Sequence, residues 1–122
     1  MRKSTVSPRQ GLGRRGEELA TEELRRRGYE IVARNWRCPE GEADIIARKG
    51  EEWLFVEVRT RRGREFGLPE ESITPRKQAR MVAVAARYLA EHDLWEVSPR
   101  LALMAVEMDR AGRLLRVDLV EI

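Results

Sequence analysis

The sequence predicts a mixed α/β domain in which two helices pack on a β-sheet. Apolar residues recur with helical spacing in residues 13–27 and 75–92. Five other segments are short, rich in β-branched or apolar residues and bounded by turn-forming residues. The resulting order is α-β-β-β-α-β-β, which favours a mixed sheet flanked by helices.

The length of 122 residues fits one domain, residues 13–122. Residues 1–12 are rich in Ser, Pro, Arg and Gly without periodicity, so we expect a basic flexible tail there. No apolar run is long enough for a membrane span, and none follows the basic N-terminus as in a signal peptide. We therefore expect a cytoplasmic protein without a membrane partner.

Composition narrows the possible chemistry. The single cysteine, Cys38, excludes an internal disulfide and a multi-cysteine zinc site, and the single histidine, His92, excludes a histidine metal triad. The net charge is +3, and 21 of the 24 basic residues are arginines, which bind phosphate in a fork geometry. The arginine content alone also fits simple solubility, so it does not define a site.

The first helix, residues 13–27, ends before a glycine cap at Gly28. Its inner face is formed by small and apolar residues: Gly16, Leu19, Ala20 and Leu24. Successive residues of an α-helix are rotated by about 100°, which places Glu17 at the border of that face. It can reach a site on the sheet or pair with an arginine, and spacing alone favours the pairing.

Residues 29–36, 41–48 and 52–60 predict three strands of an antiparallel meander. Alternation places Glu42 and Asp44 on one face of the second strand, and Glu57 and Arg59 on one face of the third. The other face of the third strand is apolar and should pack in the core. Acids near the middle of a sheet are costly unless a cation or a ligand meets them.

Residues 61–72 predict a loop that carries Arg61, Arg62, Arg64 and a lone aromatic residue, Phe66. Because it leaves the strand of Glu57, it could cover a polyanion, or it could be an ordinary surface loop.

The second helix begins with Thr74 as N-cap and Pro75, and its first turns carry Arg76, Lys77 and Arg80. The helix dipole disfavours cations there, so a phosphate partner is one explanation and a solvated basic face is the other. Strands at 100–108 and 113–122 follow, joined by a turn at 109–112, and the first of these is apolar on both faces, as in a covered interior strand.

The four candidate catalytic residues are Glu17, Asp44, Glu57 and Arg59. Asp44 and Glu57 could bind Mg²⁺ or Mn²⁺, and Arg59 could stabilise charge on a phosphoryl group. Glu17 or Glu42 could hold a second metal or a metal-bound water. An ion pair between Arg59 and Asp44 across the two strands is an equally weighted alternative.

Two runs carry a family resemblance: Gly-Glu-Ala-Asp-Ile-Ile-Ala at 41–47 and Phe-Val-Glu-Val-Arg-Thr-Arg at 55–61. Further matches are Gly16-Glu17 with Ala20, Gly28-Tyr29, Arg34-Asn35, Phe66-Gly67, Ile73-Thr74, Lys77 and Tyr88-Leu89. Over residues 13–106 the chain resembles the YraN-like family of uncharacterised bacterial proteins. That family is similar to Holliday-junction resolvases and the PD-(D/E)XK nuclease superfamily, which implies a restriction-endonuclease-like αβββαβ core with an added C-terminal strand.

By the superfamily motif, Glu17 corresponds to the acid of the first helix, Asp44 to the motif aspartate and Glu57 to the second acid. Arg59 stands in the place of the lysine. YraN-like proteins carry either residue there, but arginine cannot deprotonate to act as a base, so a metal-bound hydroxide, Lys49 or Lys77 would have to replace it. The family also commonly has Arg-Phe-Asp where this chain has Arg-Leu-Ala at 100–102.

The resemblance implies a Mg²⁺- or Mn²⁺-dependent nuclease that acts on DNA, branched DNA in particular, and works as a homodimer. Six basic residues are then candidates for nucleic-acid contacts: Arg61, Arg62, Arg64, Arg76, Lys77 and Arg80. Two other classes of function stay open. One is a non-catalytic nucleic-acid-binding module on the same fold, and the other is a protein-interaction scaffold whose acids form salt bridges.

Overall fold

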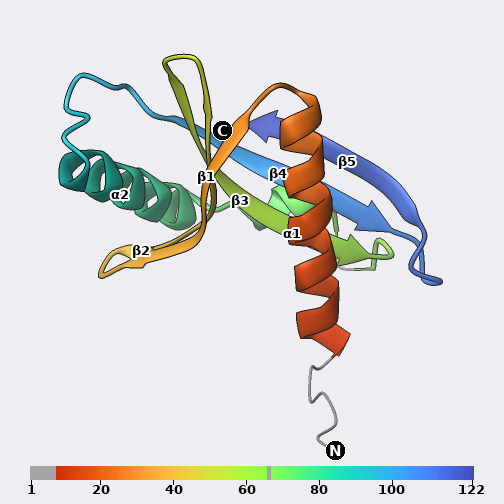
Figure 1. Cartoon of the computed structure of the whole chain (residues 1–122). Coiled ribbons are helices and arrows are strands. Elements are labelled where there is room, and N and C mark those ends of the chain that lie inside the picture. Colours follow the sequence, from red (N-terminus) through yellow and green to blue (C-terminus); the bar gives the residue numbers. More distant parts are fainter. Residues whose placement is uncertain (1–7, 66) are drawn as a thin grey trace, which may run out of the picture.

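The computed structural model describes residues 8–65 and 67–122, with side chains from residue 11 onward (Figure 1). Along the chain the elements are α1 (Pro8–Arg26), β1 (Glu30–Cys38), β2 (Gly41–Lys49), β3 (Glu52–Arg62), the 3₁₀ helix η1 (Pro69–Ser72), α2 (Pro75–Glu91), β4 (Arg100–Met108) and β5 (Leu114–Glu121). The predicted α/β class, with an αβββαβ core and one additional C-terminal strand, is confirmed.

The five strands form one mixed sheet in the order β1-β2-β3-β4-β5. The pairs β1/β2, β2/β3 and β4/β5 are antiparallel, as predicted for the meander and the C-terminal hairpin. β3 and β4 are parallel, because the chain between them crosses through η1 and α2. β4 lies between β3 and β5 and is buried from Ala102 to Met108, in agreement with the predicted covered strand.

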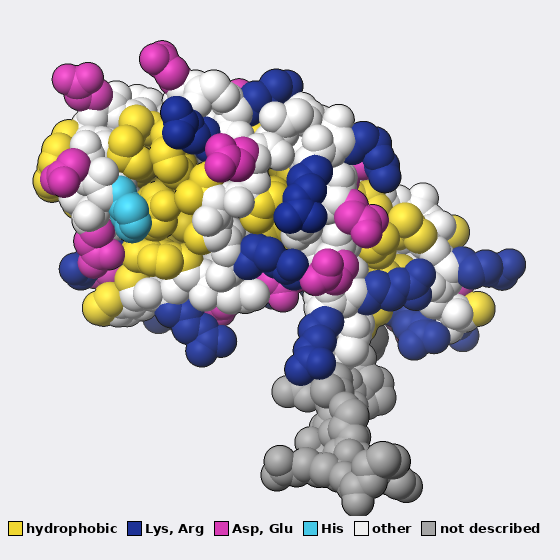
Figure 2. All heavy atoms as spheres, in the orientation of Figure 1, with side chains coloured by type: hydrophobic (Ala, Val, Ile, Leu, Met, Phe, Trp, Pro, Cys, Tyr) yellow, Lys and Arg dark blue, Asp and Glu magenta, His cyan; other side chains and the backbone are white. Residues whose placement is uncertain are grey.

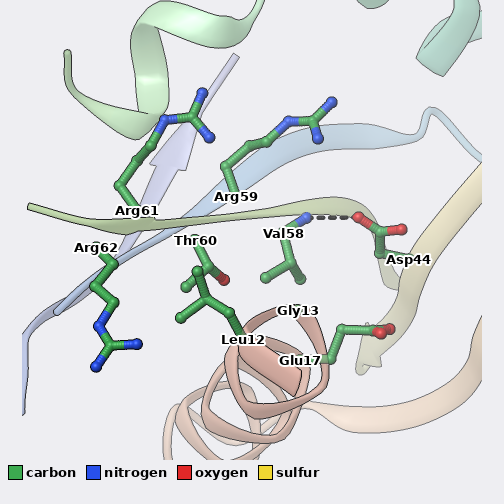
Figure 3. Close-up of a pocket in the computed structure, with 9 residues that line it drawn as sticks. All are labelled: Leu12, Gly13, Glu17, Asp44, Val58, Arg59, Thr60, Arg61 and Arg62. Atoms are coloured by element: carbon green, nitrogen blue, oxygen red, sulfur yellow. Dashed lines mark hydrogen bonds between the residues drawn. The ribbon is translucent and has the colours of Figure 1, made fainter. Parts of the chain in front are cut away.

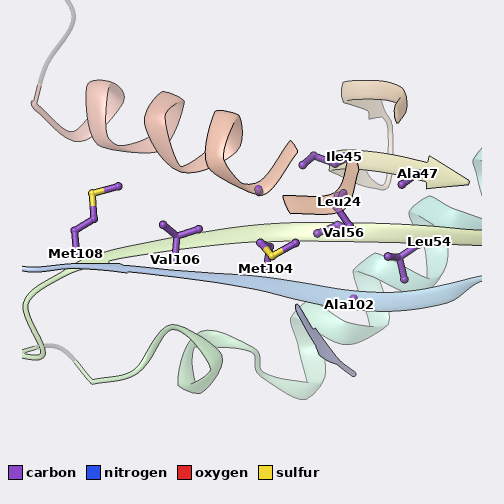
Figure 4. Packing of buried hydrophobic residues seen from close by; sticks show 10 residues of the cluster. Leu24, Ile45, Ala47, Leu54, Val56, Ala102, Met104, Val106 and Met108 are labelled. Carbon is purple, nitrogen blue, oxygen red and sulfur yellow. The ribbon is translucent and has the colours of Figure 1, made fainter. Parts of the chain in front are cut away.

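Each face of the sheet has its own core. Leu24 of α1 packs on alternate residues of β2, β3 and β4, among them Ile45, Val56 and Met104 (Figure 4). On the opposite face, Tyr88 of α2 packs on Phe55. The period-two alternation of the strands therefore sorts side chains between α1 and α2, with Glu57 and Arg59 on the α2 side.

α1 begins at Pro8, five residues before the predicted start, so residues 8–12 are helical and not part of a tail. The two glycines at 11 and 13 lower helix propensity, but Leu12 packs against the first core and tertiary contact outweighs local preference. Residues 1–7 and Phe66 lie outside the described residues. No helix in the described ranges is both long and apolar enough to cross a bilayer.

β3 runs two residues past its predicted end, so Arg61 and Arg62 belong to the strand and not to a loop. The extension follows from pairing, because Thr60, Arg61 and Arg62 all have partners on β4. On the face of the molecule in Figure 2, acidic and basic side chains intermingle and form no large area of one sign.

Candidate functional site

β2 and β3 diverge at Asp44. Their pairing runs from Lys49 and Glu52 to Ile45 and Val56 and stops there. At the next residue of β2, Asp44, the side chain rather than the backbone contacts β3. The Asp44 carboxylate accepts a hydrogen bond from the Val58 amide at 2.8 Å (Figure 3). Asp44 is therefore held at the point where the two strands separate.

Two recesses meet at this point, and we call them together the fork groove. The recess on the α1 side encloses about 600 Å³ and the recess on the α2 side about 330 Å³. Asp44 and Arg59 line both. The α1 side is also lined by Glu17, Thr60, Arg61 and Arg62, and the α2 side by Glu42, Glu57, Lys77 and Arg80. All four candidate catalytic residues thus line the fork groove: Glu17 on the α1 side, Glu57 on the α2 side, and Asp44 and Arg59 on both.

The environment of Asp44 is short of positive charge. Burial raises the pKa of its carboxyl group to about 6, and the negative charges of Glu57, Glu17 and Glu42 add to the rise, against the hydrogen bond from Val58. Among the described residues Asp44 forms no salt bridge, so the predicted alternative of an Arg59–Asp44 ion pair is not observed. A cation in the groove would favour the ionised form.

Glu17 also lacks a counterion. Its Oε1 is buried and has no hydrogen-bond partner in the described part of the chain. The neighbouring Glu18 takes the arginine instead and pairs with Arg34 at 2.9 Å. The expected pairing of Glu17 with an arginine is therefore not observed, and Glu17 remains on the lining of the groove.

Gly16 determines how close Glu17 comes to the sheet. A Cβ atom at this buried position would overlap the Oγ1 of Thr60. Glycine thus lets α1 lie directly against β3, and the next residue along the helix then lines the fork groove. Gly13, in the same helix, has no atom within 4 Å of the corresponding position.

Gly16→Ala is expected to lower the free energy of unfolding by about 1–3 kcal/mol, because α1 must move away from β3. Gly13→Ala is the matched control and should raise it by about 0.5–1 kcal/mol through helix propensity. Urea unfolding followed by circular dichroism measures both. Thr60→Ala should restore part of the loss in the Gly16 variant, and equal effects at the two glycines would contradict the close approach.

Arg59 pairs with Glu57 and not with Asp44. Its Nη2 lies 2.5 Å from Oε1 of Glu57, two residues away on the same face of β3. Its Nε is buried without a hydrogen-bond partner among the described residues. In Figure 3, Arg59 and Arg61 leave β3 on the opposite side from Thr60 and Arg62, so arginines flank the strand on both faces.

The carboxylates of Asp44 and Glu57 supply part of the ligand set that a hard divalent cation needs. Asp44 and Glu57 line the same recess, and Mg²⁺ is usually held by one or two carboxylates, with water and substrate phosphates completing its shell. In the described ranges no group of three or more His, Cys, Asp or Glu side chains is arranged to hold a metal ion. Glu17 and Glu42 therefore act on the pKa of Asp44 without forming a closed cage with it.

The predicted nucleic-acid contacts divide into two groups. Arg61, Arg62, Lys77 and Arg80 line the fork groove. Arg64 donates its Nε to the carboxylate of Glu107 at 3.0 Å, so its charge is compensated within the fold. Arg76 is exposed on α2 and does not contribute to the lining.

Of the two lysines considered as replacements for the superfamily lysine, only Lys77 lines the groove. Lys49 donates to the carbonyl of Arg27 at 2.9 Å, near the far end of β2. Thr60 and the Val58 amide are parts of the site that no sequence pattern singled out. Both are placed by the strand register, so they can be identified only once the pairing of β2 and β3 is known.

Residues 16–122 match the profile of the uncharacterised protein family UPF0102. The chain is 48% identical over 101 residues to a UPF0102 protein of Beutenbergia cavernae, covering 83% of this chain and 86% of that protein. It is 51% identical over 98 residues to one of Roseiflexus castenholzii (80% and 79% covered) and 43% identical over 113 residues to one of Moorella thermoacetica (93% and 94% covered). The resemblance to the YraN-like proteins is confirmed, because UPF0102 is that family.

Proposed function

Because the chain belongs to the UPF0102 family, which is defined without an activity, we propose its function from the fork groove. We propose that it binds DNA along the groove and hydrolyses phosphodiester bonds with Mg²⁺ or Mn²⁺ held at Asp44 and Glu57. The resemblance to Holliday-junction resolvases suggests branched DNA as the substrate.

The observation that carries this proposal is the environment of the Asp44 carboxylate. Its carboxylate is held at the strand fork by a backbone amide, beside three other acids and without a basic partner in the described residues. Such an arrangement is costly unless a cation completes it. A bound divalent ion would polarise a phosphodiester oxygen and lower the pKa of a coordinated water.

The other residues of the groove have separable roles in this proposal. Glu57 would leave Arg59 to bind the ion, and the freed guanidinium could then bind the phosphoryl oxygens, for which its fork is suited. Glu17, with its unpartnered oxygen, could accept a hydrogen bond from the attacking water. Arg59 itself cannot remove a proton.

The basic residues support binding of a backbone on both sides of the reacting centre. Arg61 and Arg62 line the α1 side, and Lys77 and Arg80 line the α2 side. A strand of nucleic acid that follows these four side chains would pass over Asp44, which lines both recesses. Phosphate contacts of this kind give affinity without sequence preference.

A non-catalytic nucleic-acid-binding protein is the second candidate, and one observation favours it. Glu57 is engaged by Arg59 at 2.5 Å, and arginine stands where the nuclease superfamily has lysine. If that ion pair persists in the presence of divalent ions, Asp44 is left as a single ligand. The groove would then bind phosphate without hydrolysing it.

The two candidates separate in an assay with fluorescent linear and four-way-junction DNA. We expect binding that weakens steeply with salt, and cleavage that requires Mg²⁺ or Mn²⁺ and stops with EDTA. Lys77→Ala and Arg80→Ala should each weaken binding and reduce the salt slope by about one. Arg76→Ala, on the same helix outside the groove, is the control and should change little.

Binding without cleavage in any divalent ion would support the second candidate. Absence of binding at low salt would contradict both and favour a protein partner.

A further inference from the structure

β5 is a regular, uncovered edge of the sheet. It is last in the strand order, and within the described residues no strand pairs with its outer side. Three of the six large apolar residues that the described part of the chain exposes lie on β5 or directly after it: Leu114 at 43%, Leu115 at 65% and Ile122 at 37%. Hydrophobic side chains are visible over this end of the sheet in Figure 2. An edge of this kind is a template for another strand.

The opposite edge, β1, is protected from such pairing. Its register shifts between Ile31 and Ala33, and Asn35 takes a left-handed conformation with φ of 53°. Bulges and backbone irregularities of this kind interrupt the hydrogen-bonding groups that an added strand would need. In β5 the register shift lies at Met108 and Leu114, so residues 116–121 pair regularly with β4.

The sequence of β5 is complementary to itself in the antiparallel direction. We propose that β5 pairs with β5 of a second copy of this chain, centred on Val117, so that the two sheets become one continuous sheet about a two-fold axis. In this register Arg116 lies opposite the partner's Asp118. Leu115 lies opposite the partner's Leu119, Leu114 opposite the partner's Val120, and Arg113 opposite the partner's Glu121.

Symmetry leaves few other registers. A two-fold axis between antiparallel strands must set one residue opposite its own copy, because directly opposite side chains lie on the same face. Centring the pair on Arg116 would oppose two arginines, and centring it on Asp118 would oppose two aspartates. Like charges in these positions destabilise a pair. Val117 is the centre that pairs every charged residue of the strand with its opposite.

The proposed pairing also explains the exposure of Leu115. Val117 and Leu119 pack against the core on the α1 side, and alternation puts Leu115 on the same face, where it is exposed. Across the axis Leu115 would contact the partner's Leu119, which extends that core from one subunit to the next. Asp118 is 49% exposed and lies 3.3 Å from Arg116 of its own strand and 3.8 Å from Arg27, just after α1, so the partner's Arg116 would join an acid that already faces two arginines.

A contact made by one strand and a few side chains is small, and interfaces of that size are reversible. We therefore expect a dimer whose population rises with concentration. The proposal is independent of nuclease activity, because no residue of the fork groove takes part.

Sedimentation velocity on the full chain tests the association. The average mass should rise from monomer toward dimer with concentration. Leu115→Lys should raise the dissociation constant at least about tenfold, since it removes the apolar pair at both ends of the interface. Val82→Lys, at another exposed apolar residue (51%) on α2, is the control and should leave the constant unchanged.

Cysteine cross-linking tests the register. In a Cys38→Ser background, Val117→Cys should cross-link to its own copy on mild oxidation, because opposite Cβ atoms lie about 5 Å apart. Leu119→Cys should not, since each copy would lie four residues from the other. A wild-type chain that is monomeric at every concentration, or that binds only an extended peptide of another protein, overturns the proposal. So does equal cross-linking at the two positions.

Discussion

Asparagine in place of Asp44 is expected to abolish divalent-ion-dependent cleavage and, in the same protein, to stabilise the fold above pH 6. The amide keeps an oxygen that can accept the hydrogen bond from Val58 but carries no charge to bind a cation. Loss of a metal ligand removes several kcal/mol of transition-state stabilisation, so the rate should fall at least about 100-fold.

The gain in stability follows from the raised pKa. The carboxyl group of Asp44 moves from its usual 3.8 to about 6 in the fold, chiefly through burial. The folded state therefore disfavours the ionised carboxylate. The protonated group contributes stability below pH 4, and this contribution is lost as the pH rises through 6 and the folded protein ionises. The asparagine variant escapes this loss. After allowance for solvent screening, its advantage should grow to about 2 kcal/mol at pH 7.

Urea unfolding at pH 4.5 and 7.5 without divalent ions measures the advantage, and Mg²⁺ should then raise the melting temperature of the wild-type protein but not of the variant. Glu18→Gln is a matched control, because Glu18 is exposed and paired with Arg34 outside the groove. Retained cleavage in the Asp44 variant would contradict the metal site. An unchanged pH profile would contradict the account of its electrostatics.

Glu107→Ala should be clearly destabilising, at about 2–4 kcal/mol, because it removes two charge-assisted hydrogen bonds from a buried position. The side chain is 3% exposed, and its two oxygens accept from Arg64 at 3.0 Å and from Arg116 at 2.9 Å. Arg116 also binds Glu70 of η1 at 2.7 Å. This network ties the segment after β3 to β4 and β5, so removing the acid releases Arg64 and leaves Arg116 with Glu70 and Asp118 alone.

Glu65→Ala provides the comparison, because Glu65 pairs with Arg110 at the exposed surface and should cost less than about 1 kcal/mol. Chemical denaturation of both variants measures the difference. Similar small losses would mean that the buried network contributes no more than a surface pair. A loss confined to the segment after β3 would appear in hydrogen exchange as faster exchange there, with the core strands unchanged.

Much of the fold follows from local pattern. The helical repeat of residues 75–92 and the Thr74-Pro75 start predicted α2, which runs from Pro75 to Glu91 with Thr74 as its N-cap. The alternation at 52–60 predicted that Glu57 and Arg59 share a face of β3, and they do, in contact with each other. These features depend on residues within a few positions of one another, where backbone geometry fixes the relation.

The contacts between distant segments could not be read in the same way. The sequence offered an arginine as an ion-pair partner for Glu17 and Asp44 as one for Arg59. In the structure Glu17 has an unpartnered oxygen, and Arg59 pairs with Glu57. Arg64 was expected at a nucleic-acid surface and instead binds Glu107, 43 residues away. Several charged residues compete for each partner, and small differences in position decide the outcome.

The sequence by itself determined the order of elements, the face of β3 that carries Glu57 and Arg59, and the family. Only the tertiary structure decided where β2 and β3 separate, and hence that Asp44 lies at the fork with Glu17 on one side and Glu57 on the other. The physical reason is that periodicity is set by the backbone of one segment. The end of a ladder depends instead on the packing of two helices against both faces of the sheet.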